Sequence, residues 1–404
     1  MIIRSVGALA HSTMATTFTL YLVAALGLNP LQLLIVGVVL EAAVLVFEGL
    51  TGVVADTYGR RISVIIGMFI VGSGFALQGL VVTFESLVPV IPMFGWLLLA
   101  QVLFGLGHTF ISGAETAWVV DEVGEEKMGL LFLRANRFGQ VASLTGIGIG
   151  VGLYQLSPSL PLISVGVLYG LLGLFLIIWM KETAFERQPR AAGSGPWIEM
   201  KDTWLSGLRV IRNQPVLIFI VIVTVLSGAA SEGYDRLWGA HLMQGIGFPA
   251  DVPLSMAAWF GIISATTAIV GSALLWIVEK RLDVNKPQIV AVSLMVLMAL
   301  RIGAMVSFAF APDFAWAIGA VLLVGLIGTL YQPMYETWLN QHIEGKSRAT
   351  VLSMMGQSDA LGQIGGGPLV GWVGTRWSLR ASLTVSAVLL SPIILVLARV
   401  LRKR

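Results

Sequence analysis

The sequence predicts an all-α membrane protein with twelve transmembrane helices in two pseudo-symmetric six-helix bundles. Of its 404 residues, 56% are hydrophobic and only 12% are charged, whereas soluble domains carry about 25% charged residues. Twelve apolar runs are each long enough to cross a bilayer, and similar short motifs recur in the two halves of the chain. A chain this apolar requires lipid as its main solvent.

Each predicted span follows from its length, since a helix needs about 20 apolar residues to cross a bilayer with its backbone bonded internally. The first run is too long for the apolar part of a secretory signal, about 7–15 residues, so we expect it to be retained. Numbered helix 1 to helix 12 in chain order, the runs are residues 3–26, 31–55, 62–83, 94–120, 138–156 and 162–180, then 216–240, 253–278, 288–310, 314–339, 349–373 and 379–401.

A polar stretch between the sixth and seventh runs predicts the division into domains. We expect bundles at residues 1–183 and 215–404, joined by a cytoplasmic linker at 184–214. The AAGSGP stretch in the linker predicts a flexible break. Apolar residues at spacings of three or four then predict an amphipathic helix on the membrane surface: Trp197, Met200, Trp204, Leu208 and Ile211.

The basic residues predict the direction of the spans. With the N-terminus inside, 21 of the 25 Lys and Arg residues fall in cytoplasmic segments, as the positive-inside rule requires. We therefore expect a multi-pass protein of the cell (inner) membrane with both termini in the cytoplasm.

The two halves also resemble each other. GAETAW at 113–118 and MYETW at 334–338 place Glu115 and Glu336 221 residues apart. The same offset pairs Gly107 with Gly328, Gly146 with Gly367, and Gly150 with Gly371. Parallel repeats of this kind place a substrate site near the bilayer midplane between the halves.

Several function classes are excluded or disfavoured. The chain has no cysteine, which rules out disulfides and thiolate metal sites, and its net charge of +3 argues against a nucleic-acid partner. No phosphate-binding loop, H-E-x-x-H or G-x-S-x-G motif occurs. We therefore expect no catalytic residues, no metal and no cofactor, and the chain is not predicted to be an enzyme.

GVVADTYGRR, at residues 52–61, stands between the second and third runs. Gly52 and Gly59 allow close helix approach and a tight turn, Asp56 can meet a helix N-terminus, and Arg60 and Arg61 can pair with carboxylates. This segment resembles the signature loop of the major facilitator superfamily, and the twelve-span layout extends the resemblance over the whole chain.

The resemblance implies a secondary transporter that works by alternating access. It also implies that Asp56 contacts helix 11 and that Arg60 pairs with Asp121 at the inner end of helix 4. The predicted conformational latch comprises Gly52, Asp56, Gly59, Arg60, Arg61 and Asp121. One departure from the family pattern is Thr57, where the family usually has Arg or Lys.

The chain looks most like bacterial drug or metabolite exporters of the drug:proton antiporter type. That likeness implies proton-coupled efflux of an amphipathic or cationic small molecule. Two features differ: Gln101 replaces the usual Arg of helix 4, and the helix 5 segment 145–152 has no proline. A proton-coupled uptake permease, a non-coupled lipid flippase or scramblase, and a receptor-like protein stay open as alternatives.

Seven acids and two arginines fall within the predicted spans, more than two residues from either end. Charges there are costly unless they face water or a partner, so each is a functional hypothesis. We predict proton coupling by Glu41, Glu48 and Asp359, with Glu115 and Glu336 next in line; interhelical hydrogen bonding is the alternative. Near the outer end of helix 7 we predict an outer gate formed by Glu232, Asp235 and Arg236. Arg301, in helix 9, is expected to neutralise an acid of a neighbouring helix.

The resemblance implies a central cavity lined by helices 1, 4, 7 and 10. Aromatic residues beside acids suit an amphipathic or cationic substrate. The predicted cavity residues are His11, Thr17, His108, Tyr331, Gln332, Tyr335 and Trp338. The expected partners are this substrate, protons and the lipid bilayer, and we expect a monomer.

Overall fold

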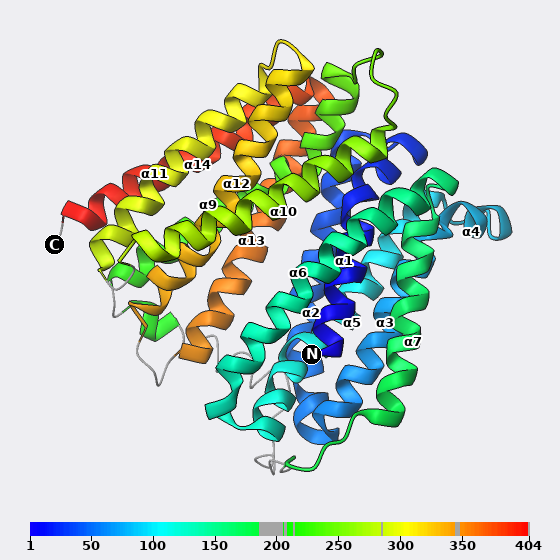
Figure 1. The fold of residues 1–404 in the computed structure, drawn as a ribbon, viewed down its shortest axis with the longest axis vertical. Helices are drawn as coiled ribbons and strands as arrows, with labels where there is room; N and C mark the ends of the chain where they lie inside the picture. Colours follow the sequence, from blue (N-terminus) through cyan, green and yellow to red (C-terminus); the bar gives the residue numbers. More distant parts are fainter. Residues whose placement is uncertain (186–204, 206–207, 213–214, 284–285, 344–347, 403–404) are drawn as a thin grey trace. The chain divides into compact units, whose positions relative to one another are not determined.

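The computed structural model describes residues 1–404 except 186–204, 206–207, 213–214, 284–285, 344–347 and 403–404 (Figure 1). Over the described ranges, all regular structure is helical. The chain forms two compact units: unit 1 comprises Met1–Tyr21 and Val39–Met200, and unit 2 comprises Leu22–Val38 and Lys201–Arg404. The predicted linker at 184–214 and its amphipathic helix lie largely outside the described residues.

Unit 1 contains the N-terminal helices. Six of them are long, and α4 is a short helix of 7 residues. They are α1 (Ile2–Leu20), α2 (Pro30–Tyr58), α3 (Arg60–Gly79), α4 (Val81–Leu87), α5 (Met93–Val123), α6 (Glu125–Leu156) and α7 (Leu160–Trp179). The first turns of α2, up to Val38, belong to unit 2.

Unit 2 contains the C-terminal helices. They are α9 (Pro215–His241), α10 (Met256–Arg281), α11 (Pro287–Ala309), α12 (Phe314–Asn340), α13 (Arg348–Arg376) and α14 (Leu379–Arg402). A π-helical turn continues α9 at Leu242–Ile246, and another continues α1 at Tyr21–Ala25. These two turns begin 221 residues apart, which is the spacing of the predicted repeat.

Nine helices in the described part of the chain are long and apolar enough to cross a membrane. The chain is therefore a multi-pass membrane protein. The other three long helices, α1, α6 and α13, carry more polar and glycine residues along their length. The prediction of twelve spans in two six-helix bundles stays a prediction where it depends on these three.

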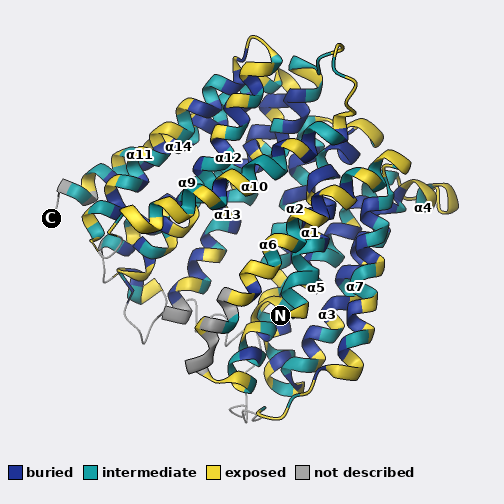
Figure 2. Cartoon of the chain, in the orientation of Figure 1, coloured by how far each residue is buried: buried dark blue, intermediate teal, exposed yellow. Residues whose placement is uncertain are grey.

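Burial differs between helices according to what surrounds them. In the most apolar stretch of α3, 61% of residues are buried, against 17% in α10 (Figure 2). α3 packs against both α5 and α7, and Val64 and Met68 contribute its side of a core with Leu172 and Leu176. α3 is thus an interior helix of unit 1.

Glycines bring two helix pairs unusually close. A Cβ atom at Gly146 or Gly150 of α6 would lie 2.4 Å from the carbonyl oxygen of Leu9 or Thr13 of α1. In unit 2, a Cβ atom at Gly362 of α13 would lie 2.2 Å from the carbonyl oxygen of Val225 in α9. Small residues of this kind allow helix backbones to pack tightly within a membrane.

The contact between a glycine and a carbonyl oxygen of the neighbouring helix recurs in the two halves of the chain. The sequence offset between the two contacts differs from the predicted repeat offset. Gly362 and its partner Val225 each lie 216 residues after Gly146 and its partner Leu9. The sequence comparison had paired Gly146 with Gly367, and the structure corrects this by five residues. Both segments contain several closely spaced glycines, so sequence alone could not decide which one lies at the helix crossing.

Candidate functional site

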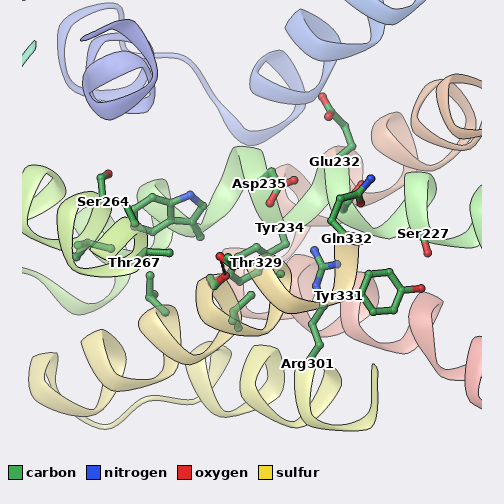
Figure 3. A pocket seen from close by; sticks show the side chains of 18 of the residues that line it. Ser227, Glu232, Tyr234, Asp235, Ser264, Thr267, Arg301, Thr329, Tyr331 and Gln332 are labelled. Carbon is green, nitrogen blue, oxygen red and sulfur yellow. Dashed lines mark hydrogen bonds between the residues drawn. The ribbon is translucent and has the colours of Figure 1, made fainter. Parts of the chain in front are cut away.

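Unit 2 contains a cavity of about 710 Å³ between α9, α10, α11, α12 and α13 (Figure 3). Binding sites for small molecules typically measure about 300–1,000 Å³. The lining residues are Ser227, Ser231, Glu232, Tyr234, Asp235, Trp238, Ile263, Ser264, Thr267, Ala268, Arg301, Val321, Val324, Gly325, Gly328, Thr329, Tyr331, Gln332, Asp359 and Gln363. We call this space the unit 2 cavity.

Helical spacing explains why these polar residues converge. In α9, Ser227, Ser231 and Asp235 are four residues apart, so they lie on one face of the helix. In α13, Asp359 and Gln363 have the same spacing. Each helix therefore contributes a polar stripe to the cavity wall.

Two of the three acids in the cavity wall have partners on their own helix. Glu232 Oε1 accepts a hydrogen bond from Arg236 Nε at 2.9 Å, and the two side chains form an ion pair. Asp359 Oδ2 accepts a hydrogen bond from Gln363 Nε2 at 2.8 Å. In Figure 3, Glu232 points away from Arg301.

Asp235 and Arg301 differ from these acids. Neither forms an ion pair or a side-chain hydrogen bond with any residue that the structure describes, and Arg301 Nε is buried without a partner. Asp235 is exposed although it lies within α9, because its surface opens into the unit 2 cavity. Arg301 extends from α11 into the space that Asp235 and Gln332 face (Figure 3).

A second cavity of about 280 Å³ adjoins the first and shares Ser227, Tyr331, Gln332 and Asp359 with it. The hydroxyls of Thr224 and Tyr335 hydrogen-bond to each other in its wall. Glu336 also lines it, and Glu336 Oε1 accepts a hydrogen bond from Gln332 Nε2 at 3.1 Å. Asp359 therefore contacts both spaces.

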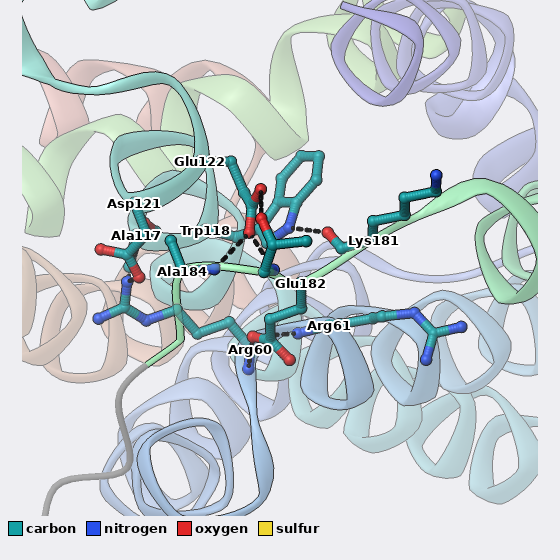
Figure 4. Close-up of polar contacts among 10 residues, drawn as sticks. Arg60, Arg61, Ala117, Trp118, Asp121, Glu122, Lys181, Glu182 and Ala184 are labelled. Atoms are coloured by element: carbon teal, nitrogen blue, oxygen red, sulfur yellow. Dashed lines mark hydrogen bonds and ion pairs between the residues drawn. The ribbon is translucent and has the colours of Figure 1, made fainter.

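Unit 1 contains a polar cluster where α2 ends and α3 begins (Figure 4). Gly59 has φ 110°, a conformation that favours glycine, and a Cβ atom there would lie 2.6 Å from Glu182 Oε2. Glu182 Oε1 accepts hydrogen bonds from the backbone N–H groups of Arg60 and Arg61, at 2.7 and 3.1 Å. Glu182 thus caps α3 in place of an N-terminal side-chain cap.

The arginines of this cluster tie α3 to its neighbours. Arg60 forms an ion pair with Asp121 and donates from Nη1 to the carbonyl oxygen of Ala117 at 2.9 Å. Arg61 Nη2 donates to the carbonyl oxygen of Ile177 at 2.6 Å. The start of α3 is thereby bonded to the ends of both α5 and α7.

The sequence profile of the Major Facilitator Superfamily matches residues 1–364. The chain belongs to the major facilitator superfamily (MFS). It is therefore a membrane transporter by family. A curated relative, the "Uncharacterized MFS-type transporter YxaM" of Bacillus subtilis (strain 168), is 27% identical over 370 residues, which cover 90% of this chain and 86% of the relative.

Solved MFS structures share the fold. A mutant of the nucleoside transporter NupG superposes with a TM-score of 0.75 at 14% identity, covering 100% of this chain and 98% of the other. A bacterial homologue of the human lysosomal transporter Spinster gives a TM-score of 0.72 at 14% identity, covering 99% of this chain and 95% of the other. At these identities the likeness concerns the fold alone.

The structure brings together part of the predicted MFS latch. Arg60 pairs with Asp121, and Gly59 provides the turn before it. Asp56 is exposed, and a Cβ atom at Gly52 would meet nothing within 4 Å. The predicted contact of Asp56 with predicted helix 11, which corresponds to α13, would join the two units. It stays a prediction, as does the latching role of the whole group.

The predicted coupling acids are distributed over both units. Glu41 and Glu48 lie on the part of α2 that belongs to unit 1, whereas Asp359 lies in unit 2. Their predicted association therefore stays a prediction. Glu115 forms an ion pair with Arg4 of α1 at 3.5 Å, and Glu336 lines the smaller cavity of unit 2.

The predicted substrate residues also have different environments. Tyr331 and Gln332 line the unit 2 cavity, and Tyr335 lines the smaller one. Thr17 and Trp338 are buried, with 2% and 1% exposure, and His11 and His108 are exposed residues of unit 1. Sequence reasoning missed Ser264 and Thr267 of α10, although two hydroxyls at helical spacing in an apolar helix were a usable signal.

Proposed function

We propose that this MFS protein exports an amphipathic or cationic small molecule in exchange for protons, by alternating access. It does so as a twelve-span protein of the cell (inner) membrane with both termini in the cytoplasm. The observation that carries the proposal is the unit 2 cavity, where three carboxylates lie beside the aromatic side chains of Tyr234, Trp238 and Tyr331. Aromatic faces and carboxylates both attract organic cations.

Asp359 is the acid that we assign to proton coupling within the cavity. A Cβ atom at Gly228 of α9 would lie 2.3 Å from the carbonyl oxygen of Asp359 and 2.9 Å from its Oδ1. The carboxyl group therefore lies at the crossing of α9 and α13. An ionised group at this depth is costly without a counter-charge, so either a proton or a cationic substrate neutralises it. Such competition produces exchange.

The ion pair of Glu232 and Arg236 serves as the outer gate in this proposal. The ion pair lies against the first turns of α2, where Gly37 leaves room for the Glu232 carboxylate, and this position supports the role. Arg60 and Asp121 serve as the latch on the opposite, cytoplasmic side. The two ion pairs would then break and form in alternation as the transporter turns over.

Ethidium, a planar aromatic cation with a permanent charge, tests the proposal in proteoliposomes. An imposed acid-inside pH gradient should drive ethidium into the protein-containing vesicles, and a protonophore should abolish the accumulation. Protein-free liposomes give the passive background. Asp359→Asn should still equilibrate ethidium but lose the gradient-driven accumulation. Accumulation in the alkaline compartment would instead identify an uptake symporter, and gradient-independent equilibration by the unaltered protein would refute proton coupling.

A further inference from the structure

Some charged side chains of the unit 2 cavity have a hydrogen-bond partner among the described residues, and others do not. Glu232 is bonded by Arg236 and Asp359 by Gln363, so both acids have partners on their own helices. Asp235 and Arg301 are the charged groups of the cavity wall that have no such bond in the described part of the chain. One carries a negative charge and the other a positive charge.

We propose that the unit 2 cavity binds a zwitterionic solute, with Asp235 receiving its ammonium group and Arg301 its carboxylate. The inference rests on the proposed function, because it takes this cavity as the substrate site. It adds a preference, at this cavity, for a solute that also carries an anionic group over a cation without one. The solute class is that of small amino acids and related ammonium carboxylates.

The state of Arg301 carries the anionic half of the proposal. A guanidinium has five N–H donors in a planar fork that matches a carboxylate, and its Nε here is buried without an acceptor. A buried donor with no acceptor is costly, so the site favours any ligand that supplies one. A site for a solute with only a positive charge would have no use for Arg301, because the guanidinium repels a cation.

The relation between Arg301 and Asp235 carries the second half. Asp235 and Arg301 carry opposite charges and line the same cavity from α9 and α11 (Figure 3). The two side chains nevertheless do not meet within ion-pair distance, and both line a cavity of about 710 Å³. A solute with opposite charges at its two ends can contact both groups at once.

The rest of the wall suits the body of such a solute. Trp238 and Tyr234 present aromatic surface from α9, and Thr267 and Thr329 present hydroxyls from α10 and α12. The cavity falls in the size range of sites for metabolites. An alternative account of the two charges is mutual neutralisation across the cavity without a ligand, and the experiment must separate the two.

Binding to the purified full-length protein can be measured by thermal stabilisation, which needs no proton gradient. The probes are glycine, leucine, phenylalanine and tryptophan, each as the free amino acid, the cationic amide and the anionic N-acetyl derivative. At least one free amino acid should bind more tightly than its own amide and N-acetyl forms. Arg301→Gln should weaken its binding by roughly ten- to hundredfold, the loss of a charge-assisted contact, and should not weaken binding of the cationic amide. Arg301→Lys should retain the preference.

Matched controls keep this test specific. Arg376→Gln and Asp251→Asn remove the same groups at exposed positions outside the cavity and should change nothing. If Arg301→Gln fails to fold, the double variant Asp235→Asn/Arg301→Gln removes both charges together. The proposal requires that this variant lose the preference for the free amino acid.

Some outcomes would overturn the inference. Retention of the preference by the double variant would mean that the two charges only neutralise each other. Equal binding of the free amino acid and its amide, or no stabilisation by any probe, would also refute it. Ethidium exchange driven by a pH gradient would then still support the proposed function. Zwitterion binding without proton-driven transport would support the zwitterion site and refute the proposed proton-coupled export.

Discussion

Gly37 of α2 leaves the space that the carboxylate of Glu232 fills, since a Cβ atom at position 37 would lie 1.5 Å from Glu232 Oε1. The same segment of α2 also contacts α13. Leu31 N–H donates to Thr375 Oγ1 at 3.0 Å, and Leu34 Cβ lies 3.1 Å from where a Cβ atom would stand at Gly371. The first turns of α2 are therefore packed on α9 and α13, although the rest of α2 belongs to unit 1.

If these contacts form a closed outer gate, a covalent bond across them should stop transport. The sequence contains no cysteine, so an introduced pair reacts without background. We expect Leu34→Cys/Gly371→Cys to form a disulfide on oxidation, because the Cβ positions are near disulfide range. Transport of ethidium should fall to background after oxidation and recover after reduction.

A pair within unit 1 provides the control. Ala8 Cβ lies 3.8 Å from the Cβ position of Gly139, so Ala8→Cys/Gly139→Cys should also form a disulfide, between α1 and α6. Both helices belong to unit 1, so transport should survive oxidation. Undiminished transport by the oxidised Leu34/Gly371 pair would show that the first turns of α2 do not open.

Two neighbouring glycines of α6 should respond oppositely to alanine. Gly146→Ala should lower the unfolding temperature, because its Cβ would press on the backbone oxygen of Leu9. Overpacking of this kind typically costs about 1–3 kcal/mol. At Gly148 a Cβ atom would meet nothing within 4 Å, so Gly148→Ala should stabilise by up to about 1 kcal/mol through helix propensity. Equal effects of the two substitutions on thermal unfolding would contradict the helix contact described.

The ion pair between Arg60 and Asp121 should matter more for transport than for stability. The side chains are 21% and 30% exposed, and exposed pairs contribute about 0–1 kcal/mol. We expect Asp121→Asn, like Asp56→Asn, to impair transport with nearly normal expression and unfolding temperature. The charge-reversed pair Arg60→Asp/Asp121→Arg should regain part of the activity of the single variants. Normal transport by both Asp56→Asn and Asp121→Asn would remove the latch hypothesis.

Amide variants test the coupling acids one at a time. We expect at least one of Glu41→Gln, Glu48→Gln and Asp359→Asn to keep ethidium equilibration and lose its dependence on the pH gradient. The reason is that an amide cannot exchange a proton while it fills the same space. Glu85→Gln, at a Glu outside the predicted coupling set, is the control. If all three variants retain gradient-driven accumulation, Glu115 and Glu336 become the next candidates.

Much of the fold was predictable because membrane helices follow from length and apolarity. The nine most apolar helices coincide with predicted spans, and the family predicted from residues 52–61 is confirmed. Arg60 was assigned to Asp121 from a family resemblance, and the structure pairs them. The cap that Glu182 forms on α3 was not predicted, since no spacing rule connects residues 122 positions apart.

The sequence by itself determined that this chain is a helical membrane transporter of the MFS, because hydropathy and a short local motif contain that information. The tertiary structure decided which polar residues share a space. Asp235 was placed in an outer gate from its position along one helix, and the structure turns it into the cavity opposite Arg301, 66 residues away. It also decided that Gly362 and Gly366 bring α13 close to the backbone of α9. Helical rotation and the choice of neighbouring helix set such contacts, and both depend on packing between segments far apart in the chain.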